Sequence, residues 1–155
     1  MTVLRLADIA RSDSDPDEII AGRGVTRTLS DFGGVTLCGV RRQTLEPGAR
    51  TSDRHWHEAE DEFLYVVAGE ATVVEDDGPH RLGPGEFCCW PAGVPNAHTV
   101  ENRSDRPCSF LVAGSRPEDD VCHYPDHGRR LDTVGRKWRV VEVATGRTLK
   151  GNWSD

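Results

Sequence analysis

The feature that most constrains the fold of this chain is a succession of short apolar runs, each ended by glycine or proline, between residues 35 and 114. The run EFLYVVAG (62–69) is rich in β-branched and aromatic residues, and GPGEFCCWP (83–91) has turn formers on both sides. Such runs recur roughly every eight to twelve residues, a spacing typical of an antiparallel sandwich or barrel. We therefore expect an all-β fold, with strands over 35–45, 50–57, 62–69, 70–76, 80–82, 83–91, 96–102 and 107–114.

The chain of 155 residues suits one domain with its own hydrophobic core. The strand pattern predicts a barrel over 34–114, an N-terminal arm over 1–33 that packs on it, and a C-terminal extension over 115–155. Within the extension, DDVCHYPD (119–126) and KWRVVEV (137–143) are candidate edge strands outside the barrel.

Two neighbouring runs of the predicted barrel, 62–69 and 70–76, follow each other without a spacer. A glycine, Gly69, stands at their junction, where a tight turn would need its conformational freedom. We expect the two runs to form a hairpin around this residue.

Charge and composition exclude several classes of partner. Nineteen basic and 26 acidic residues give a net charge of −7, which disfavours binding to a nucleic-acid backbone. No apolar stretch approaches the ~20 residues that cross a bilayer, and the N-terminus lacks the basic and apolar regions of a secretory signal. We expect a soluble, cytoplasmic protein that binds neither nucleic acid nor membranes. Its five cysteines include no CxxC pair, which argues against a disulfide framework or a thiolate zinc site.

The segment DRHWHEAEDEF (53–63) concentrates metal-binding side chains. In a strand, residues i and i+2 point to the same face, so His55 and His57 project together. A turn through 58–61 can return Glu62 beside them on the next strand. Two imidazoles and one carboxylate form half of an octahedral site for a divalent transition metal.

Each of these side chains also has a simpler interpretation. Taken alone, His55 and His57 could be polar residues at the solvent-exposed end of a strand, and Glu62 could be an ordinary surface carboxylate. The acidic residues of 58–61 fit a solvated turn, with a gate or a proton relay as the alternative. A fourth ligand from a distant part of the chain would favour a metal site.

The segment GEFCCWPAGVPNAHTVEN (85–102) supplies that candidate, His98. Together with 48–69, it resembles the two sequence motifs of the cupin superfamily, in the right order. The chain is similar to small, single-domain bacterial cupins of uncharacterised activity, some described as sugar-phosphate-isomerase-like, and DVCHYPD (120–126) resembles a stretch that those proteins carry after the barrel. The residues that match the motifs are Gly48, His55, His57, Glu62 and Gly69 in the first, and Gly85, Pro91, Gly93, His98 and Asn102 in the second.

The second motif departs from the family pattern in one respect. Two residues commonly separate the Pro-x-Gly turn from its histidine, whereas four do so here, and Asn96 occupies the usual histidine position. The intact spacing from His98 to Asn102 favours His98 as the ligand, reached through a longer turn. The alternatives for the fourth ligand are His80, His123 and His127.

The resemblance implies a cupin double-stranded β-helix, that is, a jelly-roll barrel, and a homodimer. It also implies one divalent metal held by His55, His57, Glu62 and His98. This ligand set suits manganese, iron, nickel, zinc or copper without choosing among them. If Glu62 and His98 point into the barrel, strand alternation makes Leu64, Val66 and Asn96 point inward as well. We therefore predict that these three residues line a small-molecule pocket.

Three functions remain open at this point. The first is a metal-dependent enzyme acting on a small oxygen-rich molecule, as a dioxygenase or as a sugar or sugar-phosphate isomerase. The second is a non-catalytic module that uses the metal to bind or sense a small molecule, and the third is a metal-free cupin. The sequence assigns no catalytic residue, and fold alone does not separate these functions.

Overall fold

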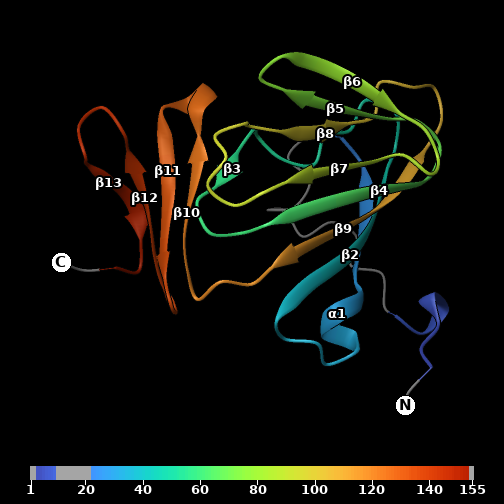
Figure 1. Ribbon diagram of the computed structural model, residues 1–155, viewed down its shortest axis with the longest axis horizontal. Helices are drawn as coiled ribbons and strands as arrows, with labels where there is room; N and C mark the ends of the chain where they lie inside the picture. The colour runs from blue at the N-terminus through green and yellow to red at the C-terminus, as the bar shows by residue number, and fades with distance from the viewer. Residues whose placement is uncertain (1–2, 10–21, 154–155) are drawn as a thin grey trace.

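The computed structural model describes residues 3–9 and 22–153, which form a β-barrel of two antiparallel sheets with a third sheet beside it (Figure 1). The short helices are η1 (Leu6–Asp8), α1 (Leu29–Phe32) and η2 (Pro125–His127). The strands up to the end of the barrel are β1 (Gly24–Thr28), β2 (Cys38–Leu45), β3 (Trp56–His57), β4 (Glu62–Ala68), β5 (Ala71–Glu75), β6 (Gly78–Leu82), β7 (Phe87–Trp90), β8 (Thr99–Glu101) and β9 (Cys108–Ser115). Those that follow are β10 (Asp119–Tyr124), β11 (Arg129–Val134), β12 (Lys137–Glu142) and β13 (Thr148–Gly151).

The strands are arranged in three sheets, and the strand pairs of the described residues are antiparallel. One barrel sheet has the order β1-β2-β9-β4-β7 and the other the order β6-β5-β8, while the third sheet has the order β13-β12-β11-β10-β3. The predicted all-β jelly-roll fold is confirmed. Within the described part of the chain, the helices are too short to reach across a membrane.

The hairpin expected around Gly69 is wrong. Strand β4 pairs with β7 and β9, whereas β5 pairs with β6 and β8 in the opposite sheet. Gly69 has a φ of 76°, and a Cβ there would come within 2.5 Å of the Pro107 carbonyl oxygen. The chain uses this glycine to turn from one sheet to the other, and strand periodicity alone does not reveal which partner a strand takes.

The ends of the chain contain more strand than expected. The predicted arm includes β1, which pairs with β2 over five residues and extends the first barrel sheet. The two candidate strands of the extension appear as β10 and β12, and β11 and β13 join them. Strand β10 also pairs with β3, through Cys122 opposite His57, so the third sheet includes a segment of the barrel region. The boundaries 1–33, 34–114 and 115–155 stay a prediction.

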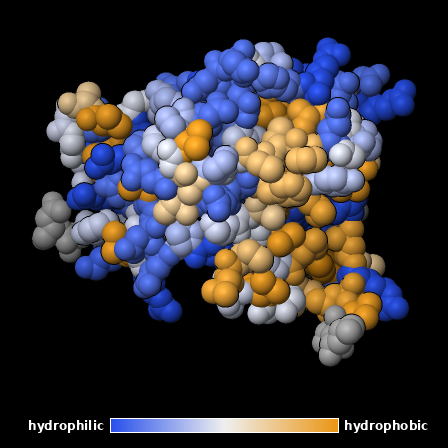
Figure 2. Space-filling view, in the orientation of Figure 1, coloured by the Kyte–Doolittle hydropathy of each residue, from blue (hydrophilic) through white to orange (hydrophobic). Residues whose placement is uncertain are grey.

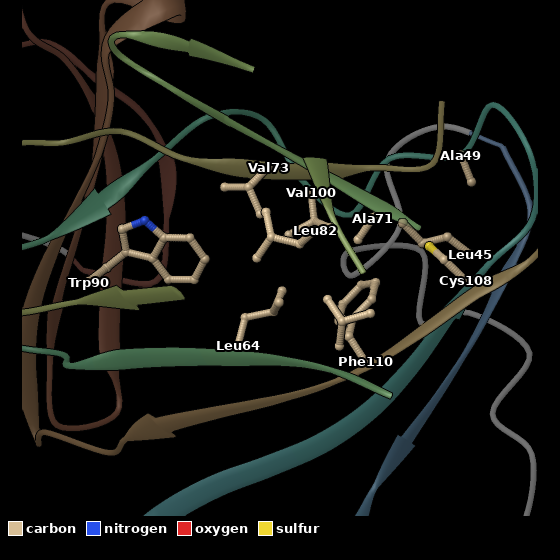
Figure 3. Close-up of a cluster of buried hydrophobic side chains, with 11 residues drawn as sticks. Leu45, Ala49, Leu64, Ala71, Val73, Leu82, Trp90, Val100, Cys108 and Phe110 are labelled. Carbon is tan, nitrogen blue, oxygen red and sulfur yellow. The ribbon is translucent and has the colours of Figure 1, made fainter. Parts of the chain in front are cut away.

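The hydrophobic core lies between the two barrel sheets, where Phe110 and Leu64 pack against apolar side chains of the facing sheet (Figure 3). The side chains of β4 alternate between the core and the outside, as strand alternation from an inward Glu62 predicts. Leu64 and Val66 are fully buried, while Phe63 and Tyr65 point outward and are 37% and 38% exposed. Burial of large apolar side chains at these inward positions is what favours the barrel energetically.

Ion pairs fasten the extension to the barrel. The Arg54 guanidinium donates two hydrogen bonds of 2.9 Å to the Asp126 carboxylate and a third of 2.9 Å to Asp76. Nearby, the buried Asp53 carboxylate accepts a 2.8 Å hydrogen bond from Arg129. The loop that leads into β3 is therefore bonded to the extension through both Asp53 and Arg54.

Candidate metal centre

The site begins with a backbone bridge between two histidines. His55 N–H donates to the His98 carbonyl at 3.1 Å, and His98 N–H donates back to the His55 carbonyl at 2.9 Å. Residues that exchange both hydrogen bonds in an antiparallel pair carry their side chains on the same face. The two imidazole centroids accordingly lie 4.9 Å apart. The longer turn after Gly93 thus delivers His98 to the side of His55.

His57 and Glu62 complete the group. His57 lies two residues after His55 on the same face, and Glu62 is the first residue of β4. One carboxylate oxygen of Glu62, Oε2, lies 3.0 Å from His98 Nε2 and 3.9 Å from the Nε2 atoms of both His55 and His57. The structure therefore brings together all four side chains that the sequence singled out.

The spacing of these atoms suits a metal ion. Ligand atoms of His55, Glu62 and His98 all lie within 4.8 Å of one another. Two ligands that each bind one ion at about 2.0–2.2 Å are separated by up to about 4.4 Å. His55, Glu62 and His98 therefore have a spacing that fits a divalent cation, and no thiolate belongs to the set, while His57 groups with Glu60 and Asp120.

The far nitrogens of two imidazoles have partners that orient them. His55 Nδ1 lies 2.9 Å from the Asp53 carbonyl oxygen, and His57 Nδ1 lies 2.5 Å from a carboxylate oxygen of Asp120. An acceptor at Nδ1 holds the proton there and leaves the Nε2 lone pair free for a metal. The Nε2 atoms of both rings then face the Glu62 carboxylate.

His98 is held in a different way. The Trp90 ring stacks on its imidazole, with a centroid separation of 3.8 Å and an interplanar angle of 9°. Trp90 Nε1 donates to Glu75 at 2.5 Å, which fixes the indole in turn. His98 Nδ1 is buried, and within the described residues it has no hydrogen-bond partner. The stacked indole and the 3.0 Å contact of Nε2 with Glu62 together orient this imidazole.

Burial and charge set the protonation of the group. Burial alone would raise the pKa of Glu62, but the hydrogen bond from His98 and the electrostatic interactions with the neighbouring histidines lower it to about 2. Burial lowers the pKa of His55 to about 4, against the opposing charge of Glu62. At neutral pH, Glu62 is therefore an anion and His55 a neutral imidazole, the forms that bind a metal.

His57 differs from its neighbour. Burial lowers its pKa, but interactions with Cys122, Glu62 and Asp120 outweigh burial and raise the pKa to about 10. In the metal-free protein at neutral pH, this imidazole carries a proton on Nε2. A metal that binds there must release that proton, so affinity rises with pH below this pKa.

The acidic turn after β3 is not simply solvated. Glu58 pairs with His123 at 2.8 Å, and Asp61 accepts a 2.8 Å hydrogen bond from the Ala92 N–H. Burial, together with the charges of Glu62 and Asp120, raises the pKa of Glu60 to about 7. The turn is thus bonded to β10 and to the segment after β7.

The predicted pocket residues lie in two places. Leu64 and Val66 are fully buried members of the barrel core. Asn96 Oδ1 accepts a 3.3 Å hydrogen bond from the Asp76 N–H, at the turn after β5. Their role as pocket lining stays a prediction. The alternative fourth ligands contact carboxylates other than Glu62, since His80 pairs with Asp77, His123 with Glu58 and His127 with Asp53.

Strand β10 adds side chains that sequence reasoning missed. Cys122 pairs with His57, so alternation puts Asp120, Cys122 and Tyr124 on the face that His57 occupies. The Tyr124 ring centroid lies 5.9 Å from that of His55. Strand alternation applied to DDVCHY could have shown that these three side chains share a face, but not which strand that face meets.

Comparisons with known proteins agree with this architecture. A family model described as a cupin domain matches residues 41–114. The crystal structure of a cupin-superfamily sugar phosphate isomerase from Silicibacter pomeroyi is 33% identical and superposes with a TM-score of 0.83, covering 94% of this chain and 95% of that one. Protein SchB of Streptomyces halstedii is 29% identical over 125 residues, 79% of this chain and 88% of SchB. The dimethylsulfoniopropionate lyase DddQ of Ruegeria pomeroyi is 39% identical over 75 residues, which are 46% of this chain and 35% of the lyase.

Proposed function

This chain belongs to the cupin superfamily, and from that premise we propose that it is a metal-dependent enzyme that acts on a small, oxygen-rich molecule. One observation carries the proposal. The Nε2 atoms of His55, His57 and His98 all lie within 4 Å of a single oxygen of Glu62. We propose these four residues as the metal ligands.

The charge of the site fits such chemistry. Three neutral imidazoles and one carboxylate leave a divalent ion with a net charge near +1 and leave two positions of an octahedron free. When bound, the ion would act as a Lewis acid on an oxygen of the substrate. The chain itself orients the ligands, and Trp90 shields His98 from water through its stacked ring.

Isomerisation of a sugar or sugar phosphate is the reaction that we favour. It is supported by the name of the Silicibacter pomeroyi relative, which shares one third of its sequence with this chain. A dioxygenase reaction on a diol or enol is the second candidate, because two free positions can hold two adjacent substrate oxygens. The acidic residues around the site, Glu60 and Asp120 among them, would repel a phosphate group, so free and phosphorylated sugars should be compared in pairs.

Non-catalytic binding is the alternative function. An isomerase needs a base at the carbon beside the carbonyl, and none is assigned here. A panel assay distinguishes the two functions. Sugar interconversion followed by NMR and oxygen uptake with diols and enols would both be negative for a binding module, while ligand titration would still show saturable, metal-dependent binding.

Metal content is the first test of this proposal. We expect the purified protein to carry, or to take up, close to one equivalent of manganese, iron, nickel, zinc or copper per chain. Elemental analysis after dialysis measures this directly. Protein that stays below one tenth of an equivalent after exposure to all five metals would rule out the metal-dependent function and favour the metal-free alternative.

A homodimer is proposed for the assembly, through the outer face of the first barrel sheet. Four apolar side chains point outward there and are 37–61% exposed, namely Phe63, Tyr65, Val67 and Phe87. Figure 2 shows the orange surface gathered over this sheet and α1, while β10–β13 are mostly blue. A contiguous apolar patch of this kind on a soluble protein marks an interaction surface.

Replacing Val67 with glutamate is expected to shift this dimer to monomer. A two-fold interface repeats each substitution, so the change would bring two buried charges together. Val134 on β11 is the matched control, because it is 43% exposed against 41% for Val67 but lies in the third sheet. Light scattering after size exclusion would give the mass of each variant. Equal masses for both variants and the wild type would contradict the assigned face.

A cytoplasmic location and a small-molecule partner are also proposed. All five cysteines are free thiols, as a reducing compartment requires. The net charge of −7 disfavours nucleic acid as the partner.

A further inference from the structure

We propose that Asp120, on strand β10 of the C-terminal extension, is a positioning residue that holds the His57 imidazole with Nε2 toward the metal. This inference rests on the proposed metal-binding function. It assigns a role in the site to a residue that lies outside the segment matched by the cupin family model, 41–114.

The contact is direct and well oriented. Asp120 Oδ2 lies 2.5 Å from His57 Nδ1, and Asp120 Oδ1 accepts a 2.9 Å hydrogen bond from the Ala59 N–H. The carboxylate therefore spans the metal-binding histidine and the start of the turn that leads to Glu62. Its side chain is 13% exposed, and that of His57 is 14% exposed, so water competes little for the bond.

The backbone register explains why the carboxylate arrives there. Cys122 is the partner of His57 in the β10–β3 pair, so Asp120 lies two residues further along β10 and on the same face. The neighbouring residue Asp119 faces the opposite side and accepts a hydrogen bond from the Gly135 N–H. Two adjacent aspartates thus differ in one respect that matters, the face of β10 that each occupies.

Only a carboxylate satisfies both contacts of residue 120. His57 Nδ1–H and Ala59 N–H are both donors, and an ionised aspartate offers an acceptor to each. Asparagine offers one acceptor and would turn its NH₂ group toward the second donor. Glu60 is the other carboxylate near His57 Nδ1, but its Oε2 lies 3.9 Å away, which is beyond hydrogen-bond distance.

The test compares the metal affinity of three full-length proteins. For Asp120→Asn, we expect the dissociation constant for Zn²⁺ or Co²⁺ to rise roughly 10- to 100-fold, the usual effect of losing the partner of a metal-binding histidine. Asp119→Asn should stay within twofold of wild type. Competition with a chromophoric chelator gives the constants, and the d–d absorption of bound Co²⁺ reports the change in ligand geometry at Asp120→Asn.

Two further measurements keep the outcome decisive. Circular dichroism and thermal unfolding of the metal-free proteins show that each variant is folded, and Asp120→Glu, which keeps two acceptor oxygens, should recover part of the lost affinity. An affinity within twofold of wild type for Asp120→Asn would overturn the inference, as would an equal loss in Asp119→Asn. Wild-type protein that binds no metal would overturn the proposed function itself, which is a distinct result.

Discussion

Replacing His98 with alanine is expected to weaken metal binding more than 100-fold. The imidazole is the group closest to Glu62, and losing a ligand costs more than losing the outer hydrogen bonds, whose removal costs roughly 10- to 100-fold. The reaction that depends on the metal should disappear with it. Isothermal titration of the metal-free protein would measure the affinity, and elemental analysis the occupancy after purification.

Controls separate this effect from damage to the fold. His98 is buried against Trp90, so alanine also removes a stacked ring and leaves a cavity. His98→Gln fills most of that volume without supplying an imidazole and should show the same loss of metal. His80→Ala, at an exposed histidine paired with Asp77, should bind metal like the wild type. Full occupancy in both His98 variants would refute the assigned ligand set.

Replacing Phe110 with alanine is expected to lower the free energy of unfolding by about 3–5 kcal/mol. Phe110 is fully buried, and in Figure 3 it lies in the middle of the core between the two barrel sheets. The loss combines the transfer free energy of the ring with the cavity that it leaves behind. Since small domains have total stabilities of about 5–15 kcal/mol, the variant should be only marginally folded.

Urea unfolding of the metal-free protein, followed by tryptophan fluorescence, would measure this loss. Phe32→Ala on α1 is the control, because that ring is 47% exposed and the loss should be less than half as large. If both substitutions lower the free energy of unfolding by the same amount, burial of the Phe110 ring would not explain its contribution to stability. If Phe110→Ala does not fold at all, Phe110→Leu provides a smaller change with the same expected sign.

The site residues that could be predicted from the sequence alone lie close together along the chain. His55, His57 and Glu62 lie within eight consecutive residues, so strand alternation and one turn suffice to bring them together. His98 needed the second motif, because it lies far along the chain, immediately before β8. The inward orientation of Leu64 and Val66 followed from the same alternation, and both are buried.

The missed parts depend on pairing between distant segments. The hairpin at Gly69 was wrong because alternation fixes the face of a strand but not its neighbour, and here the chain changes sheets. Strand β11 (Arg129–Val134) was missed because most of its residues are only half-buried, which leaves little apolar periodicity to detect. Asp120 was missed for the first of these reasons, since its strand was expected but its partner His57 belongs to another part of the chain.

The pairing of β3 with β10 has a consequence for the order in which the molecule assembles. The contact between His57 and Asp120 closes a loop of 63 positions, and such a contact forms only after the chain between them has been made and largely ordered. During synthesis, a ribosome would release the complete barrel sequence before it released β10. Under the proposed function, a nascent chain would therefore pass through a stage in which a metal is bound loosely, and tight binding would mark the end of folding.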